Sequence, residues 1–90
     1  MLEGRLKIVN PLGLHARAAA QLVRLAGRFR SKITLQRVDS GFFADAKSIL
    51  SVLTLAASMG TEVLIKVDGA DALEAYEAVC DLISSGFGEL

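Results

Sequence analysis

The chain has 90 residues, of which 52% are hydrophobic and 22% are charged, and its formal net charge is zero. These values are typical of one small globular domain spanning residues 1–90, and they exclude a disordered chain. Zero net charge implies no strongly basic surface, and with no tryptophan and one tyrosine the chain has little to stack on nucleobases. Nucleic acid is therefore not expected as a partner.

Several other classes of protein are excluded by what the sequence lacks. No apolar run approaches the ~18 residues of a membrane span and no signal peptide is present, so we expect a cytoplasmic protein without direct membrane insertion. The single cysteine, Cys80, has no partner for an internal disulfide, and we expect it to pack in the core without a reactive role. There is no zinc pattern, P-loop or dinucleotide fingerprint, so neither a metal nor a cofactor is expected.

The first third of the chain reads as a strand, a turn and a helix. Residues 2–9 alternate in polarity, with Leu6 and Ile8 on one face, which predicts a strand. Residues 10–13, NPLG, have turn chemistry. A helix is predicted over residues 16–28, and four apolar residues at helical spacing form its core face: Ala19, Leu22, Val23 and Ala26.

The same helix carries a second stripe, which is basic. Arg17, Gln21, Arg24 and Arg28 recur at steps of three and four residues, starting at the N-terminal end of the helix. Such a stripe is either a solvated helix face or a surface that docks an acidic partner.

A hairpin follows the helix. Residues 33–38 predict a second strand, residues 39–41 a turn, and residues 42–44 a short third strand. Because consecutive strand residues point to opposite faces, Phe42 and Phe43 cannot both face the same core. One ring is expected to be exposed or to cover a partner surface.

Residues 45–48 lead into a short helix predicted over residues 49–55, and Ser48 or a neighbour is suited to cap it. The apolar residues of this helix are too many for one buried stripe. Some of Ile49, Leu50 and Leu53 should therefore remain at the surface. The segment is expected to end at residues 59–60.

The last third predicts a strand over residues 61–67, with Val63, Ile65 and Val67 on one face, and then a final helix. Asp71 followed by Glu74 resembles a capping box for that helix. The predicted buried stripe is Leu73, Tyr76, Val79, Cys80 and Ile83. Residues 85–87, SGF, predict a helix stop with Gly86 in the left-handed conformation and Phe87 folding back.

The resulting element order is β-α-β-β-α-β-α. Two split βαβ-like halves of this kind predict an α+β fold, an open-faced β-sandwich. It would have a four-stranded antiparallel sheet with three helices on one face.

His15, the only histidine, lies between the first turn and the first helix. A helix N-terminus has backbone N–H groups without intrahelical partners and a partial positive charge, and it binds anions such as phosphate. An imidazole in its neutral form has a free lone pair that can attack phosphorus. The N–H groups of Ala16 and Arg17 and the Arg17 guanidinium would lie near the oxygens of the new phosphoryl group. The alternative is that His15 is an ordinary helix-terminal residue and Arg17 a solvated charge.

Two motifs taken with the element order resemble a known family. The sequence GLHAR at residues 13–17 opens the first helix, and KSI at residues 47–49 opens the second. Together with the SGF ending, they resemble HPr, the family of histidine-containing phosphocarriers of the bacterial phosphoenolpyruvate-dependent phosphotransferase system. The resemblance covers essentially the whole chain.

The resemblance implies a role for each matching residue of the site. His15 would receive a phosphoryl group on Nδ1 from enzyme I and donate it to acceptor proteins such as sugar-specific enzyme IIA. Arg17 would lie beside that phosphoryl group. Ser48 matches the serine that an HPr kinase/phosphorylase modifies in some bacteria.

The resemblance also implies a docking surface for partner proteins. Ile49, Leu50 and Leu53 match its apolar patch, and Arg24 lies on its basic side. We expect a monomeric carrier with a phosphohistidine intermediate rather than an independent turnover enzyme.

The chain departs from the family pattern at Ala18, where proline is usual, and in a slightly longer hairpin around residues 39–41. Within the carrier class, a sugar-transport branch competes with a nitrogen-related regulatory branch. A second class is a regulatory module that binds a kinase or a transcription factor and transfers nothing. A third is a small enzyme with His15 as general base, which needs an orienting carboxylate, and no acidic residue lies near His15 in sequence.

Overall fold

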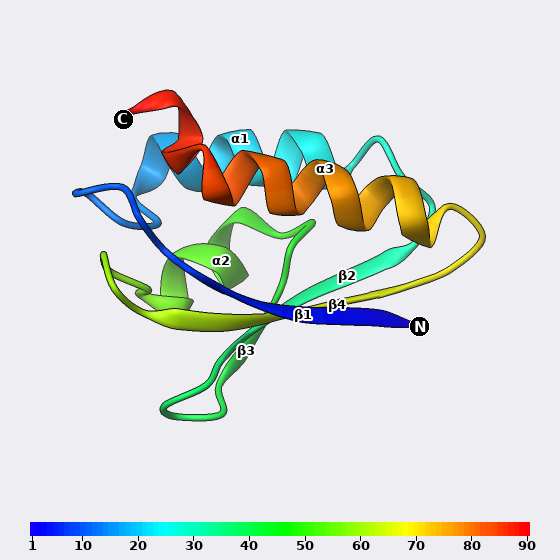
Figure 1. Ribbon diagram of the computed structural model, residues 1–90, viewed down its shortest axis with the longest axis horizontal. Helices are drawn as coiled ribbons and strands as arrows, with labels where there is room; N and C mark the ends of the chain where they lie inside the picture. Colours follow the sequence, from blue (N-terminus) through cyan, green and yellow to red (C-terminus); the bar gives the residue numbers. More distant parts are fainter.

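An open antiparallel sheet carries three helices on one of its faces in the computed structural model, which describes residues 1–90 (Figure 1). The strands are β1 (Leu2–Lys7), β2 (Lys32–Arg37), β3 (Phe43–Asp45) and β4 (Glu62–Asp68), in the spatial order β1-β4-β2-β3. The helices are α1 (Ala16–Ala26), α2 (Ile49–Leu55) and α3 (Ala72–Ser84), followed by a short 3₁₀ turn, η1 (Gly86–Gly88). The predicted fold class and element order are confirmed.

Alternation along the two central strands creates the core. In β4, Val63, Ile65 and Val67 are fully buried, whereas the residues between them are partly exposed. Leu35 of β2 pairs with Ile65, and Leu6 of β1 pairs with Val63. One face of the sheet is therefore apolar and covered, as expected for an antiparallel sheet with helices on one side.

The helices share the covering of this apolar face. Helix α3 packs over β1 and β4, α2 packs against β3, and α1 contacts both other helices. In Figure 1, α1 and α3 lie along one another above the sheet. None of the helices combines the length and the apolar character that crossing a membrane would require.

The end of α1 differs from the predicted one, whereas α2 spans the predicted residues, 49–55. Helix α1 stops at Ala26, with Gly27 as its C-cap, two residues before the predicted end. Helix α2 ends at Leu55 because Ala56 adopts a left-handed conformation with φ of 53°. On α1, Val23 is only partly buried, while Ala18 in the first turn is fully buried and belongs to the core.

The predicted buried stripe of α3 is partly wrong. Ala75, Val79 and Ile83, spaced four residues apart, are the fully buried residues, and Tyr76 and Cys80 are half-buried beside them. Leu73 lies off this stripe and is 60% exposed. Cys80 packs against the core as expected, and desolvation raises the pKa of its thiol.

The predicted capping box at the start of α3 is also wrong. The Asp71 side chain makes no capping hydrogen bond in its own helix. Its carboxylate instead accepts hydrogen bonds from the Ser31 hydroxyl and from the backbone N–H groups of Arg30 and Ser31. These bonds lower the pKa of Asp71 to about 2, and they fasten the loop between α1 and β2 to the start of α3.

The predicted helix stop is confirmed at the other end of α3. Gly86 has φ of 67°, a conformation that favours glycine, and the Phe87 side chain is buried. Phe87 anchors η1 on the core, so the chain turns back at this point and continues toward the start of α1.

Neither phenylalanine of the hairpin enters the core. Strand β3 begins at Phe43, one residue later than predicted, and its inward position is Ala44. Phe42 precedes the strand, and the two rings are 72% and 73% exposed. The pair therefore forms an apolar projection at the free edge of the sheet.

Candidate functional site

The turn that presents His15 is seated against the loop that follows α2. Gly13 has φ of 64°, and a Cβ at this position would lie 2.6 Å from the carbonyl oxygen of Ala57. The next residue, Leu14, donates its N–H to that same carbonyl at 2.9 Å. Only glycine allows this left-handed turn at such a close approach, which places His15 near the C-terminal end of α2.

His15 is the N-cap of α1, as predicted. Its backbone is extended, with φ of −73° and ψ of 179°, and its carbonyl accepts the first helical hydrogen bond, from Ala19 N–H at 2.8 Å. The side chain makes no capping bond, so the imidazole is not occupied by the helix. The N–H groups of Ala16 and Arg17 belong to the first turn, where helix geometry supplies no acceptor.

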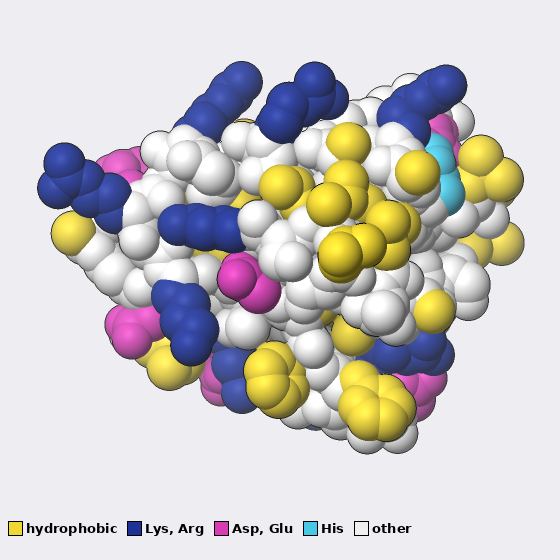
Figure 2. Space-filling model, turned by 180° about the vertical axis from the view of Figure 1, so that it is seen from behind, with side chains coloured by type: hydrophobic (Ala, Val, Ile, Leu, Met, Phe, Trp, Pro, Cys, Tyr) yellow, Lys and Arg dark blue, Asp and Glu magenta, His cyan; other side chains and the backbone are white.

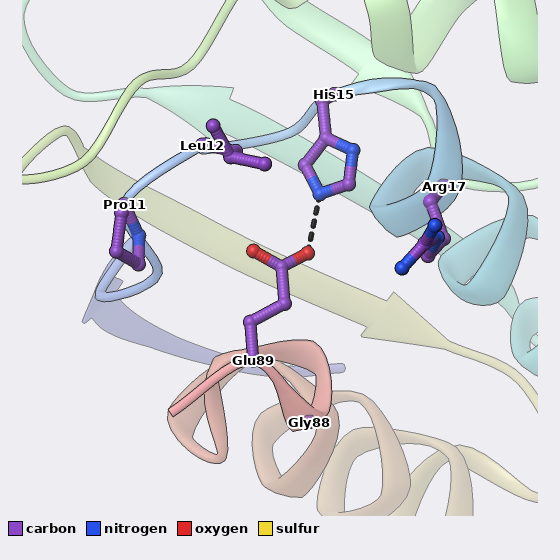
Figure 3. Close-up of a pocket in the computed structure, with 6 residues that line it drawn as sticks. All are labelled: Pro11, Leu12, His15, Arg17, Gly88 and Glu89. Carbon is purple, nitrogen blue, oxygen red and sulfur yellow. Dashed lines mark hydrogen bonds and ion pairs between the residues drawn. The ribbon is translucent and has the colours of Figure 1, made fainter.

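The Nε2 side of the imidazole contacts a carboxylate that is distant in the sequence. Glu89, just after η1, places Oε2 against Nε2 of His15 (Figure 3). The other oxygen of Glu89 accepts a hydrogen bond from the Asn10 amide at 3.2 Å. The hydrogen bond with His15, with help from Asn10 and from the charge of Arg17, lowers the pKa of Glu89 below its usual 4.5.

These residues line a shallow depression at the molecular surface. Its volume is about 560 Å³ and it opens to solvent, with six residues around it: Pro11, Leu12, His15, Arg17, Gly88 and Glu89. The His15 side chain is 24% exposed. A macromolecular partner can therefore reach the ring directly, and the depression offers no enclosed pocket for a small substrate.

Sequence reasoning found His15, Ala16 and Arg17 but missed Glu89 and Asn10. No local pattern links these two to the histidine, because 74 residues separate His15 from Glu89. The only signal was the stop at Gly86 and Phe87, which turns the following residues back. The argument against a general base was that no acidic residue lies near His15 in the sequence. In the folded chain this argument fails, because Glu89 contacts the imidazole.

Ser48 is the N-cap of α2, as predicted. Its hydroxyl accepts the Ser51 N–H at 3.4 Å, and the side chain is half-buried. The preceding residue is tied to the loop after α1, since the Lys47 ammonium donates a hydrogen bond to the Phe29 carbonyl at 2.7 Å. Ser48 is thus placed at the start of the apolar helix face.

The surface beside the histidine has the apolar and basic character that the sequence predicts. Ile49 and Leu50 are 40% and 74% exposed, while Leu53 packs partly against the core. Arg24 is exposed and, with Arg28, borders a shallow groove on α1. Figure 2 shows hydrophobic side chains gathered beside the histidine and below a row of basic side chains on one face.

Comparison with known proteins identifies the class to which this site belongs. A family profile described as the phosphorylation site of the HPr component of the phosphotransferase system matches residues 2–85. The chain is 47% identical to phosphocarrier protein HPr of Cupriavidus necator over 89 residues, covering 99% of this chain and 98% of that one. It is 40% identical to phosphocarrier protein NPr of Shewanella violacea, covering 98% and 94% of the two chains.

Solved structures agree over the whole length. HPr from Thermoanaerobacter tengcongensis superposes with a TM-score of 0.92 at 40% identity, covering 100% of this chain and 99% of that one. A dimeric form of HPr from the same organism superposes with a TM-score of 0.77, covering 99% and 100%. The open-faced fold, the histidine at the start of α1 and these likenesses together show that the chain belongs to the HPr family of phosphocarrier proteins of the phosphotransferase system.

Proposed function

We propose that this chain accepts a phosphoryl group on His15 from phospho-enzyme I and passes it to acceptor proteins of the enzyme IIA type. The observation that carries this proposal is the placement of the imidazole. It stands at the N-terminus of α1 beside Arg17, in an open depression, with Nε2 occupied by Glu89. The nitrogen left for chemistry is Nδ1.

The chemistry follows from the surroundings of that nitrogen. The lone pair of Nδ1 attacks phosphorus, and the phosphoryl oxygens meet the free N–H groups at the start of α1 and the Arg17 guanidinium. An exposed phosphohistidine is accessible to an acceptor approaching in line. The site therefore suits a group that is received and handed on, without turnover of a small substrate.

The neighbouring surface supports docking of protein partners. The exposed apolar residues Ile49 and Leu50 belong to α2, which contacts the basic helix α1, so an acidic partner with an apolar contact area fits this face. Because one carrier must meet enzyme I and then an acceptor through the same face, we infer that the working form is a monomer. We propose that it acts in the cytoplasm, as expected for its family.

The test is phosphoryl acceptance measured by intact mass. The chain is incubated with phosphoenolpyruvate and a catalytic amount of enzyme I from a related bacterium. We expect one added phosphate that is lost in acid, and none in His15→Ala. The variant should fold normally, since the imidazole is at the surface and makes no capping bond.

Arg17→Lys serves as a second variant that keeps the positive charge but loses the planar guanidinium. It should still take the phosphate, at a lower rate. Acid-stable phosphate, or phosphate retained by His15→Ala, would show that His15 is not the acceptor. Failure of the native chain, with the same enzyme I active on another HPr, would contradict the carrier role.

We also propose that phosphorylation of Ser48 regulates docking. A phosphate there would add roughly −1.5 to −2 charges beside the apolar residues of α2, while a helix N-terminus tolerates negative charge. Ser48→Asp should therefore slow phosphorylation by enzyme I without loss of stability. Ser40→Asp in the hairpin turn adds the same charge away from α2 and is the matched control; equal rates for the two variants would remove this proposal.

The branch of the phosphotransferase system is a separate question, because relatives named HPr and NPr both match the chain. A purely regulatory module would bind partners but acquire no phosphate. The mass measurement separates this alternative from the carrier, and comparing enzyme I from the sugar and nitrogen branches as donors assigns the branch.

A further inference from the structure

A chain of polar contacts runs behind the His15 ring, on the side away from Nδ1. The Asn10 side chain is fully buried, and its amide nitrogen donates to the Gly13 carbonyl at 2.8 Å and to Glu89 Oε1 at 3.2 Å. The second oxygen of Glu89 contacts His15 Nε2. In Figure 3, Nε2 points at Glu89 and the other ring nitrogen points away from it.

The hydrogen-bond donors and acceptors among Asn10, Glu89 and His15 fix which ring nitrogen carries the proton. An ionised carboxylate has only acceptors, so both groups that face Glu89 must be donors. Asn10 supplies one N–H to Glu89 and its other to Gly13. The ring nitrogen facing Glu89 must then carry the proton, which leaves the lone pair of the neutral ring on Nδ1.

We propose that Glu89, held in place by Asn10, is the positioning residue of His15. It would fix both the orientation of the ring and the tautomer in which Nδ1 is the nucleophile. The proposal rests on the phosphocarrier function and adds a residue to it.

Glu89 also faces the charge that the reaction creates. As the Nδ1 lone pair forms the new N–P bond, the bond from phosphorus to the donor breaks and the donor keeps that electron pair. Nε2 retains its proton, so the ring becomes cationic next to the carboxylate. In the onward transfer, the N–P electron pair returns to Nδ1 and the ring becomes neutral again. Arg17 is the other charged group lining the depression.

The chain offers variants that separate these effects. In Glu89→Gln the amide keeps the size of the side chain, but only its oxygen can accept a hydrogen bond. Either the contact with Asn10 fails, or an N–H₂ group faces the ring and favours the tautomer with the proton on Nδ1. Glu89→Ala removes the contact altogether, and Glu89→Asp keeps the charge on a shorter stem. Glu77→Gln, on the exposed face of α3, removes the same charge elsewhere and is the control.

Two measurements are made on each variant, after its backbone amide NMR spectrum has shown a native fold. The first is the ¹⁵N NMR signals of the neutral imidazole, which are unambiguous because the chain has one histidine. The second is the rate of phosphorylation at His15, with phospho-enzyme I and separately with inorganic phosphoramidate as donor. The small donor tests the ring without any docking contribution.

In the native chain and in Glu77→Gln, we expect Nε2 protonated and Nδ1 unprotonated, with equal rates. In Glu89→Gln and Glu89→Ala, the Nδ1 signal should shift toward the protonated position. Both rates should fall roughly ten- to hundredfold, the range that a charge-assisted hydrogen bond supplies. Glu89→Asp should recover part of the rate.

Unchanged ring signals in Glu89→Gln and Glu89→Ala, or changed signals with unchanged rates, would overturn the proposal. A native chain that takes phosphate from neither donor would refute the carrier function instead. The ring signals would still decide whether Glu89 sets the tautomer, so the two failures are distinguishable.

Discussion

Two carboxylates fasten the polypeptide at opposite ends of α3. Asp71, before the helix, holds the loop at Arg30 and Ser31, and Glu89, after η1, holds the ring of His15. Each uses both oxygens as acceptors, so each contacts two residues at once. The pKa of both carboxyls is lowered, because their hydrogen-bond donors favour the charged form.

Asp71 should make stability depend on pH in a defined window. Its pKa is about 2 in the folded chain, against 3.8 for the ordinary group. Its stabilising effect is therefore complete above the ordinary value and is lost as the pH falls from about 4 to about 2. Asp71→Asn should be less stable than the native chain at pH 6, and the difference should shrink across that window. Urea unfolding at several pH values measures this.

Asp81→Asn is the control for this prediction, because Asp81 is exposed on the same helix. Its difference from the native chain should be small at every pH. A constant difference for Asp71→Asn from pH 6 to pH 2 would show that the carboxylate does not act through its charge.

Among the elements, α2 combines buried and exposed apolar residues within seven positions. Val52 and Leu55 are buried against the sheet, whereas Leu50 points outward. Its end is held from outside, because Arg37 of β2 donates to the carbonyls of Leu55 and Ala56 at 3.2 and 3.1 Å. A helix this short is stable only through such tertiary contacts.

Leu50→Ser should therefore separate docking from folding. Leu50 is 74% exposed, so the change should alter the free energy of unfolding by no more than about 0.5 kcal/mol. If α2 docks enzyme I, kcat/KM for phosphorylation by that enzyme should fall about tenfold, equivalent to about 1.4 kcal/mol. Steady-state phosphorylation and urea unfolding give the two quantities.

Leu73→Ser provides the comparison, since Leu73 is 60% exposed on α3. It removes another largely exposed leucine without touching α2. A similar loss of rate in both variants, or none in Leu50→Ser, would contradict docking through this helix.

At the scale of the whole molecule, the sequence predicted what short-range patterns determine. Alternation in Val63, Ile65 and Val67 identified the central strand and its buried face. The turn signals around it were sufficient for the element order. Helix ends and individual exposures were less predictable. The pair Asp71 and Glu74 has the local pattern of a capping box, but a tertiary partner, Ser31, binds the carboxylate instead.

The candidate site likewise has a part that the sequence predicts and a part that it does not. His15, Ala16 and Arg17 are consecutive and lie at one helix end, so their proximity could be predicted from the sequence. Glu89 reaches the ring only because Phe87 is buried and the chain turns back at Gly86. That contact depends on how α3 lies on the sheet, which no local pattern specifies.

The tether between the first and last segments has a consequence for biosynthesis. During synthesis His15 leaves the ribosome 74 positions before Glu89. A nascent chain, or one clipped at η1, can contain the sheet and all three helices while its imidazole still rotates freely. The full rate of phosphoryl acceptance would then require that synthesis has passed Glu89 and that this segment is intact, a property that the fold alone does not signal.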